Sequence, residues 1–123
     1  MFTRLALIAL CCLTACGAFK EGAACTTEDS GGCEDSSTAL LCEGGSLHAY
    51  KCRGMGGCSS SDGTAVCDFS ASVVGEACPK RYDSKALCDS HDANGLLLCT
   101  DGLWTAHACK ACSVQGGNVI CAH

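Results

Sequence analysis

The sequence predicts a small disulfide-rich, mainly β protein made of two tandem six-cysteine repeats, each of two short β-hairpins. Fifteen of its 123 residues are cysteine, a frequency typical of disulfide scaffolds. Twelve of these cysteines form two successive sets of six. Aromatic residues make up only 5% of the chain, so a repeat of about 50 residues cannot build a sufficient core alone and disulfides must stabilise it.

The two sets of cysteines mark an internal duplication. The first set is Cys25, Cys33, Cys42, Cys52, Cys58 and Cys67, and the second is Cys78, Cys88, Cys99, Cys109, Cys112 and Cys121. In both sets nine residues separate the third and fourth cysteines and eight separate the fifth and sixth. The triplet Leu-Leu-Cys at 40–42 recurs at 97–99. Because such self-similarity indicates a repeated structural unit, we assign residues 23–69 to the first repeat and 75–123 to the second.

The charge balance excludes some classes of partner. The formal net charge is −5, whereas nucleic-acid binding needs a basic face and electrostatic docking on anionic lipid needs a basic patch. No apolar run is long enough to span a bilayer. We therefore expect no nucleic-acid partner.

The first residues resemble the signal peptide of a bacterial lipoprotein. Arg4 supplies a positive charge, and the nine residues 5–13 form an apolar segment too short to span a membrane but suited to a secretory signal. Leu-Thr-Ala-Cys at 13–16 matches the lipobox at all four positions. The resemblance implies that the signal 1–15 is removed and that Cys16 carries diacylglycerol and an acylated amino group, commonly with palmitate.

The cysteine count supports this interpretation. Fifteen is odd, but removing Cys11 and Cys12 with the signal and lipidating Cys16 leaves twelve, which divides into six and six. Residues 16–22 then form a lipid-anchored tether. By resemblance to the sorting rule of enteric bacteria, Gly17 in place of Asp favours the outer membrane of the cell envelope. The alternative is ordinary signal cleavage, with Cys16 an unpaired thiol or an intermolecular bridge.

In the first repeat, the polar, turn-rich segment 25–33 predicts a loop. The apolar segments 38–42 and 47–52 predict the two strands of a hairpin. The dipeptide Asp62-Gly63 suits a tight turn and predicts a second hairpin, whose return strand covers 64–68.

In the second repeat, the segments 96–99 and 103–109 predict the corresponding first hairpin, and 115–118 predicts the turn of the last one. The alternative to an entirely β structure is a single helical turn, either near Cys33 or over 82–88.

Seven residues, 69–75, connect the repeats, which is too short for independent domains to move apart freely. We expect Val73 and Val74 to be buried between the repeats.

We expect disulfides within each repeat, since a repeat that folds as a unit must bring its own cysteines together. Only two residues separate Cys109 from Cys112, so a pairing of the fourth and fifth cysteines is disfavoured if both repeats share one connectivity. The other pairings stay open.

Two patterns suggest metal sites, but each has a simpler explanation. Cys109 and Cys112 have the Cys-x-x-Cys spacing of zinc and redox centres, yet the exported chain enters a compartment where thiols oxidise. Residues 90–101 loosely follow a calcium-binding loop, but the flanking helices are missing and a polar turn fits better. We expect no metal and no cofactor.

Trp104 is the only tryptophan and the one candidate ligand-binding residue. On a small β surface it would stack on a sugar ring, as in carbohydrate-binding modules. The alternative is that it covers the disulfides of its own repeat, which its alignment with Leu47 favours. His107 aligns with Tyr50, which indicates a half-buried position rather than a catalytic one.

Catalytic patterns find no support. The histidines His48, His91, His107 and His123 have no serine or free cysteine partner that the sequence pairs with them. The glycine clusters lack the strand and helix context of phosphate-binding loops. We therefore predict no catalytic residues and no enzyme.

The segment 22–122 resembles the small cysteine-rich lipoproteins that some gliding soil bacteria encode in large numbers. The likeness rests on Gly-x-Ala-Cys at 22–25 and 75–78, Lys-Cys-Arg-Gly at 51–54 and Val-Cys-Asp at 66–68. It implies no chemistry, since that group has no assigned activity.

The resulting prediction is a lipid-anchored cell-envelope protein that acts as a non-catalytic binding or structural module. Its partners would be the membrane, through the N-terminal lipid, and an envelope protein or a glycan. The alternatives are a carbohydrate-binding module that uses Trp104 and a small protease inhibitor that presents a stapled loop.

Overall fold

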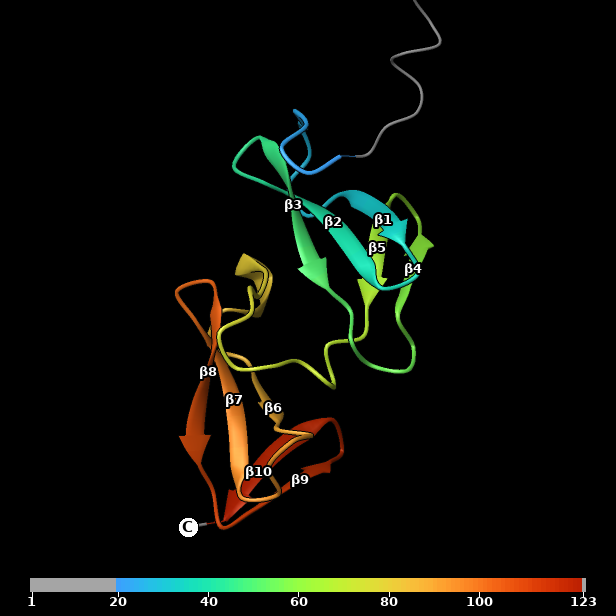
Figure 1. The fold of residues 1–123 in the computed structure, drawn as a ribbon. Helices are drawn as coiled ribbons and strands as arrows, with labels where there is room; N and C mark the ends of the chain where they lie inside the picture. The colour runs from blue at the N-terminus through green and yellow to red at the C-terminus, as the bar shows by residue number, and fades with distance from the viewer. Residues whose placement is uncertain (1–19, 123) are drawn as a thin grey trace, which may run out of the picture.

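The computed structural model describes residues 20–122 and confirms a small, mainly β, disulfide-rich protein (Figure 1). This part of the chain has ten strands, one short 3₁₀ helix and no α-helix. The strands are β1 (Gly31–Asp35), β2 (Thr38–Glu43), β3 (Ser46–Lys51), β4 (Cys58–Ser61), β5 (Thr64–Cys67), β6 (Ala86–Cys88), β7 (Gly95–Thr100), β8 (Leu103–Ala108), β9 (Ala111–Gln115) and β10 (Asn118–Ala122). The 3₁₀ helix η1 spans Lys80–Tyr82.

The first half of the described chain contains a three-stranded antiparallel sheet, β1-β2-β3, and a separate hairpin, β4-β5. Gly44 and Gly45 form the two-residue turn between β2 and β3, and Asp62 and Gly63 form the turn between β4 and β5. All four have φ between 49° and 89°, which type I′ hairpin turns require and which Gly and Asp adopt readily. The hairpins predicted for this half are confirmed.

The second half has the same order of elements. β6, β7 and β8 form a three-stranded antiparallel sheet, and β9 pairs with β10. In each half, the segment before the sheet adds an isolated bridge to its last strand, Ala24 to Ser46 and Ala77 to Leu103.

All twelve cysteines between 25 and 121 are paired, and every disulfide lies within one half. The first cysteine pairs with the third, the second with the fifth and the fourth with the sixth. The disulfides are Cys25–Cys42, Cys33–Cys58 and Cys52–Cys67 in the first half, and Cys78–Cys99, Cys88–Cys112 and Cys109–Cys121 in the second. The expected pairing within each half is confirmed, and no bridge joins a fourth cysteine to a fifth.

The loop predicted before Cys33 is confirmed for residues 26–30, but the chain at Cys33 and at Cys88 differs from the prediction. Cys33 lies in β1, which pairs with β2, rather than in a loop or a helical turn. In the segment 82–88, only Tyr82 belongs to the 3₁₀ helix, and Ala86–Cys88 is a strand that pairs with β7.

The larger core cluster lies between the two halves and contains residues of both. Phe69, Tyr82 and Trp104 form its aromatic centre, with ring centroids 5.0, 6.0 and 6.4 Å apart. Its buried members are Ala39, Leu41, Tyr50, Cys52, Ala65, Cys67, Phe69, Cys78, Leu97, Cys99 and Trp104. Each half therefore completes the core of the other.

A smaller cluster occupies the opposite face of the first sheet. Leu40, Cys42 and Leu47 are buried there beneath Ala23 and Cys25 of the preceding segment. Strand β2 is thus buried on both faces, which explains its continuous apolar sequence.

The linker was expected to bury two valines, and this prediction was wrong. Val73 and Val74 are 39% and 50% exposed. Phe69, which is 4% exposed, fills the space between the halves instead. Among the residues described, no helix is long and apolar enough to cross a membrane.

Candidate functional site

The predicted lipidation site, Cys16, lies outside the described residues, as does the signal 1–15. The described part of the tether begins at Lys20 and is attached to the first sheet. The backbone N–H of Gly22 donates to the carbonyl of Leu47 at 2.7 Å. The chain therefore reaches the fold at the outer edge of β3.

Trp104 lies in the core rather than on a binding surface. Its side chain is 1% exposed and packs against Phe69 and Tyr82. The prediction that it stacks on a sugar ring was wrong, because the neighbouring rings already cover it. The alternative, that Trp104 packs in the interior, is confirmed. Its aromatic neighbours are Tyr82 of its own repeat and Phe69, which lies between the halves. Its indole Nε1 has no hydrogen-bond partner among the described residues.

The Cys-x-x-Cys pair is not a redox or zinc centre in this structure. Cys109 is bonded to Cys121 and Cys112 to Cys88, so neither sulfur carries a free thiol. No group of three or more metal-ligating side chains that could hold an ion occurs within the described range.

The calcium-like segment is a pair of local turns. Asp89 Oδ1 accepts a hydrogen bond from the backbone N–H of His91 at 2.8 Å, and Asp92 Oδ1 accepts one from that of Asn94 at 2.9 Å. Each carboxylate stabilises its own turn, as expected if this segment is a polar turn rather than a calcium-binding loop.

The described histidines make local polar contacts on the surface. His48 Nε2 lies 3.3 Å from Ser46 Oγ, and His107 Nε2 lies 3.2 Å from Thr105 Oγ1. His91 Nδ1 lies 3.3 Å from Ser90 Oγ in an exposed turn. These contacts join residues one or two positions apart and do not converge on a pocket.

The most densely organised polar site joins the two halves, and the sequence did not predict it. Glu43, at the end of β2, is only 5% exposed. Its carboxylate accepts a hydrogen bond from the Tyr50 hydroxyl and another, at 2.6 Å, from the backbone N–H of Lys80 at the start of η1. A buried carboxylate needs such donors to offset its desolvation. The sequence gives one indication of this site. Glu43 follows the third cysteine of the first half, whereas the residue at the same position in the second half is the uncharged Thr100.

A second contact across the junction involves Arg53 and Glu76. Arg53 Nε donates to both carboxylate oxygens of Glu76 at 2.8 and 2.9 Å, and the backbone N–H of Val73 adds a bond at 3.1 Å. The hydrogen bond from Arg53 lowers the pKa of Glu76 below its ordinary value of 4.5, and the Val73 N–H acts in the same direction. The same contact raises the pKa of Arg53.

Asp68 holds the start of the linker. Its carboxylate accepts from the backbone N–H groups of Gly56 at 2.9 Å and Ser70 at 3.0 Å. Hydrogen bonds from Ser70, through its side chain and its backbone, and from Gly56 lower the pKa of Asp68.

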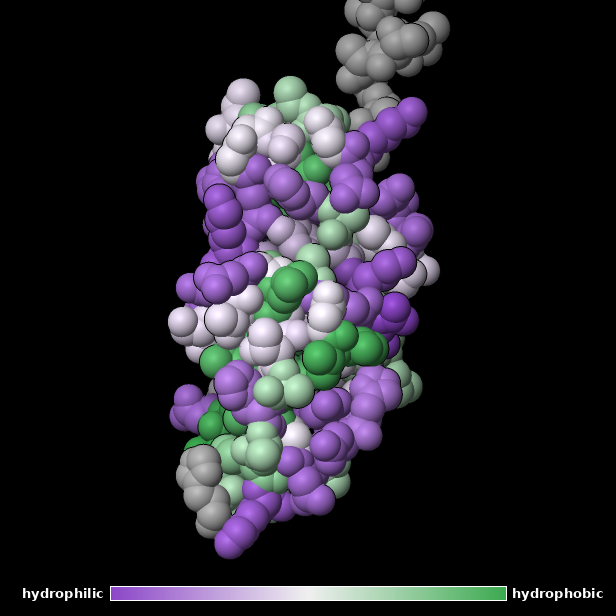
Figure 2. All heavy atoms as spheres, turned by 60° about the vertical axis from the view of Figure 1, so that its left-hand side comes forward, coloured by the Kyte–Doolittle hydropathy of each residue, from purple (hydrophilic) through white to green (hydrophobic). Residues whose placement is uncertain are grey.

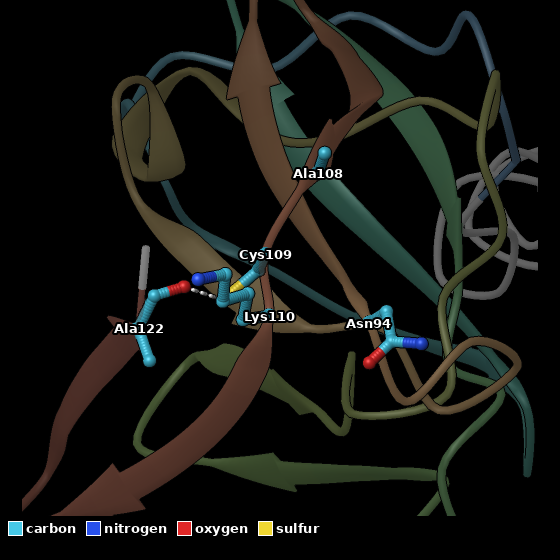
Figure 3. A pocket seen from close by; sticks show the side chains of 5 residues that line it. All are labelled: Asn94, Ala108, Cys109, Lys110 and Ala122. Atoms are coloured by element: carbon cyan, nitrogen blue, oxygen red, sulfur yellow. Dashed lines mark hydrogen bonds between the residues drawn. The ribbon is translucent and has the colours of Figure 1, made fainter.

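An open hollow of 540 Å³ lies at the end of β8 and was also not predicted (Figure 3). It is lined by Asn94, Ala108, Cys109, Lys110 and Ala122. The close-up shows Lys110 and Ala122 on one side of Cys109 and the Asn94 amide on the other, pointing away. The lining thus supplies one ammonium and one amide that do not converge on a common point.

The face of the molecule in Figure 2 carries hydrophobic residues in several small groups between hydrophilic ones. The most exposed large ones among the described residues are Met55, Val66, Val73, Val74, Leu103, Val114 and Ile120.

Comparisons with known proteins gave no match to a family model, to a curated protein or to a solved structure.

Proposed function

We propose that this chain is a lipid-anchored protein of the cell envelope that acts as a non-catalytic binding or structural module. The observation that carries the proposal is that all twelve cysteines of the described range form disulfides. Such a scaffold is stable only where thiols oxidise, outside the cytoplasm. The lipobox at 13–16 then supplies both the export signal and the anchor.

The shape of the molecule supports an anchored display module. The blue N-terminal segment of the described chain lies at one end of the molecule and the β9-β10 hairpin at the other (Figure 1). A chain held at Cys16 would therefore place the first half near the membrane and the second half away from it. Loops on a rigid, covalently stapled scaffold are suited to binding a partner.

A protein partner fits this module better than a glycan bound through Trp104. The tryptophan is buried at the junction, and the remaining described aromatic rings, Tyr50, Phe69 and Tyr82, belong to or pack against the same core. No exposed aromatic ring is left in residues 20–122 to stack on a sugar.

Intact mass measurement of the chain isolated from its native envelope tests the anchor and the scaffold together. We expect a mass that begins at Cys16 with acyl chains added, and twelve alkylated cysteines only after reduction. The Cys16→Ser variant should leave the membrane fraction, whereas Cys12→Ser, a matched change within the signal, should stay there. A Cys16→Ser protein that is still processed and retained at the membrane would refute the anchor, and free thiols without reduction would refute the scaffold.

A further inference from the structure

The connection between the fourth and fifth cysteines differs between the two halves. It has five residues in the first half, 53–57, and two in the second, 110–111. Both halves nevertheless have the same order of strands and the same pairing of cysteines. The longer connection, which we call the Met55 loop, is therefore not needed to build the fold of a half. Its ends are fixed by Cys52 and Cys58, each of which is in a disulfide.

Although the fold of a half does not need the Met55 loop, the loop is held in place by Asp68. The backbone N–H of Gly56 donates to the Asp68 carboxylate at 2.9 Å, and that of Gly54 donates to the Asp68 carbonyl at 3.0 Å. The N–H of Asp68 in turn donates to the carbonyl of Gly57 at 2.9 Å. Three hydrogen bonds thus tie the loop to the end of the hairpin beside it.

Two glycines give the loop a path that larger residues do not allow. Gly54 is buried, and a Cβ there would collide with the Asp68 carboxylate. Gly57 has a φ of 56°, and a Cβ there would collide with the carbonyl oxygen of Ser36. The N–H of Gly57 closes a turn onto the carbonyl of Gly54 at 3.0 Å. These contacts restrict the loop to a tight turn that contains Met55.

Met55 is the most exposed large hydrophobic residue among those described, and its whole side chain is in contact with solvent. Its neighbours Gly54 and Gly56 have no side chains that could shield its sulfur. Because the turn is held by its backbone, Met55 cannot fold back onto the core without breaking these contacts. The connection between β3 and β4 lies at the end of the first half opposite the blue N-terminal segment (Figure 1), so an anchored chain keeps this loop away from the bilayer.

Met55 also carries the only methionine sulfur among the described residues. The other methionine of the chain, Met1, belongs to the predicted signal. All twelve cysteines from 25 to 121 are already oxidised in disulfides. Trp104, another side chain that oxidants attack, is 1% exposed. An oxidant outside the cytoplasm therefore meets one reactive sulfur on the described fold.

We propose that Met55 is an oxidation site whose substrate is a two-electron oxidant of the peroxide class. The thioether sulfur attacks one oxygen of hydrogen peroxide, and an S–O bond forms as the O–O bond breaks. The second oxygen leaves with both protons as water, so the sulfur is oxidised by two electrons to the sulfoxide and the peroxide is reduced. Methionine sulfoxide reductases, which take their electrons from thiols, return the sulfoxide to the thioether, so the modification is reversible.

Oxidation changes the chemistry of the loop and leaves the fold intact. The sulfoxide is polar, whereas the thioether is apolar. The hydrogen bonds that hold the turn come from the backbone and from Asp68, and none of them uses the Met55 side chain. The inference rests on the proposed export of the chain and extends its proposed binding function. A partner that contacts this loop meets an apolar side chain before oxidation and a polar one afterwards.

Peroxide treatment of the full chain, purified from its native envelope with its disulfides intact, tests this proposal. We expect fragment masses to place one oxygen on Met55, with Trp104 unmodified as an internal control. The rate should lie within about twofold of that of N-acetylmethionine amide, whose thioether is unshielded. Met55→Leu, a variant that keeps an apolar side chain but has no sulfur, should take up no oxygen within residues 20–122.

Three further measurements complete the test. Methionine sulfoxide reductases of both stereochemical types should remove the oxygen, and the oxidised and reduced chains should have the same melting temperature. In cells that lack these reductases, a peroxide challenge should leave the sulfoxide at Met55 of the envelope-bound chain.

Each of several outcomes would overturn the proposal. They are a first oxygen on another described residue, a rate at Met55 more than about tenfold below the reference, an oxygen that the reductases do not remove, a lowered melting temperature of the oxidised chain, and an unmodified chain in the challenged cells. Purified Cys16→Ser should oxidise at Met55 at the same rate as wild type, so the failure of the anchor and the failure of this proposal are distinguishable.

Discussion

At the scale of single residues, Glu43 is the polar group that fixes the second half on the first. Its carboxylate is buried and accepts hydrogen bonds from both halves, from the Tyr50 hydroxyl and from the Lys80 N–H. The hydrogen bond from Lys80 to Glu43 forms only when the second half is correctly placed against the first, so Glu43 stabilises the relative position of the two halves.

Removing the Glu43 carboxylate should therefore be costly. We expect Glu43→Ala to lower the free energy of unfolding by about 2–3 kcal/mol, because the Lys80 N–H and the Tyr50 hydroxyl lose their acceptor in a buried place. Denaturant unfolding with the disulfides intact measures this change.

Glu34→Ala is the matched control, since Glu34 is exposed at the surface of β1. Its effect should stay within about 0.5 kcal/mol. Equal effects of the two substitutions would show that the junction does not depend on Glu43.

The contact between Arg53 and Glu76 predicts a dependence of stability on acid pH. The pKa of Glu76 is lowered in the folded state, so its contribution is present above 4.5 and is lost as the pH falls below that value. We expect wild type to exceed Glu76→Gln in stability at neutral pH, and the difference to vanish in acid. The Arg53 side chain is 48% exposed, so the difference at neutral pH should be small and should shrink with added salt.

Thermal melting of wild type and of Glu76→Gln, from neutral pH down to acid, measures this difference in stability. Asp68 and Asp35 also have lowered pKa values, so wild type and variant should both lose stability in acid. A constant difference between them at every pH would contradict the assignment to Glu76.

At the scale of elements, the hairpins could be predicted from the sequence because their turns are local. The turn at Asp62-Gly63 needs positive φ at both positions, and the dipeptide Asp-Gly is typical of such turns. The apolar segments that became β2 and β7 were equally clear, since each is the buried central strand of its sheet.

The strands β1 and β6 could not be predicted in the same way. Gly31 begins β1 with a φ of 150°, and a Cβ there would lie 1.9 Å from the carbonyl oxygen of Leu40. Glycine is present because the neighbouring strand approaches closely, whereas sequence rules associate it with loops. β6 has only three residues, too few to show a period.

The polar site at Glu43 and the surroundings of Trp104 were harder to predict from the sequence than the strands. The order of the disulfides and the partners of Glu43 depend on contacts between residues far apart in the chain. Trp104 illustrates the limit. Its alignment with Leu47 indicated packing, but nothing in the sequence showed that Phe69 of the linker would cover it.

At the scale of the whole molecule, the halves are coupled because the larger core belongs to both. Tyr50 is buried from the first half and Trp104 from the second, with Phe69 of the linker between the halves. Neither half retains this core without the other, although each keeps its own disulfides.

Local destabilisation of one half should consequently spread to the other. We expect Trp104→Ala to lower the free energy of unfolding by about 3–5 kcal/mol. Amide hydrogen exchange should then accelerate at Leu41 in the first half as well as at Leu97 in the second, because both amides exchange through the same cooperative opening.

Val66→Ala is the control for this last experiment, because this side chain is 54% exposed and its truncation should leave exchange at both amides unchanged. If Trp104→Ala accelerated exchange at Leu97 while Leu41 kept its wild-type protection, the halves would be independent folding units joined by a tether. Parallel acceleration at both amides would instead mean that the two halves, each held by its own disulfides, unfold as one cooperative structure whose stability is set by the shared aromatic cluster.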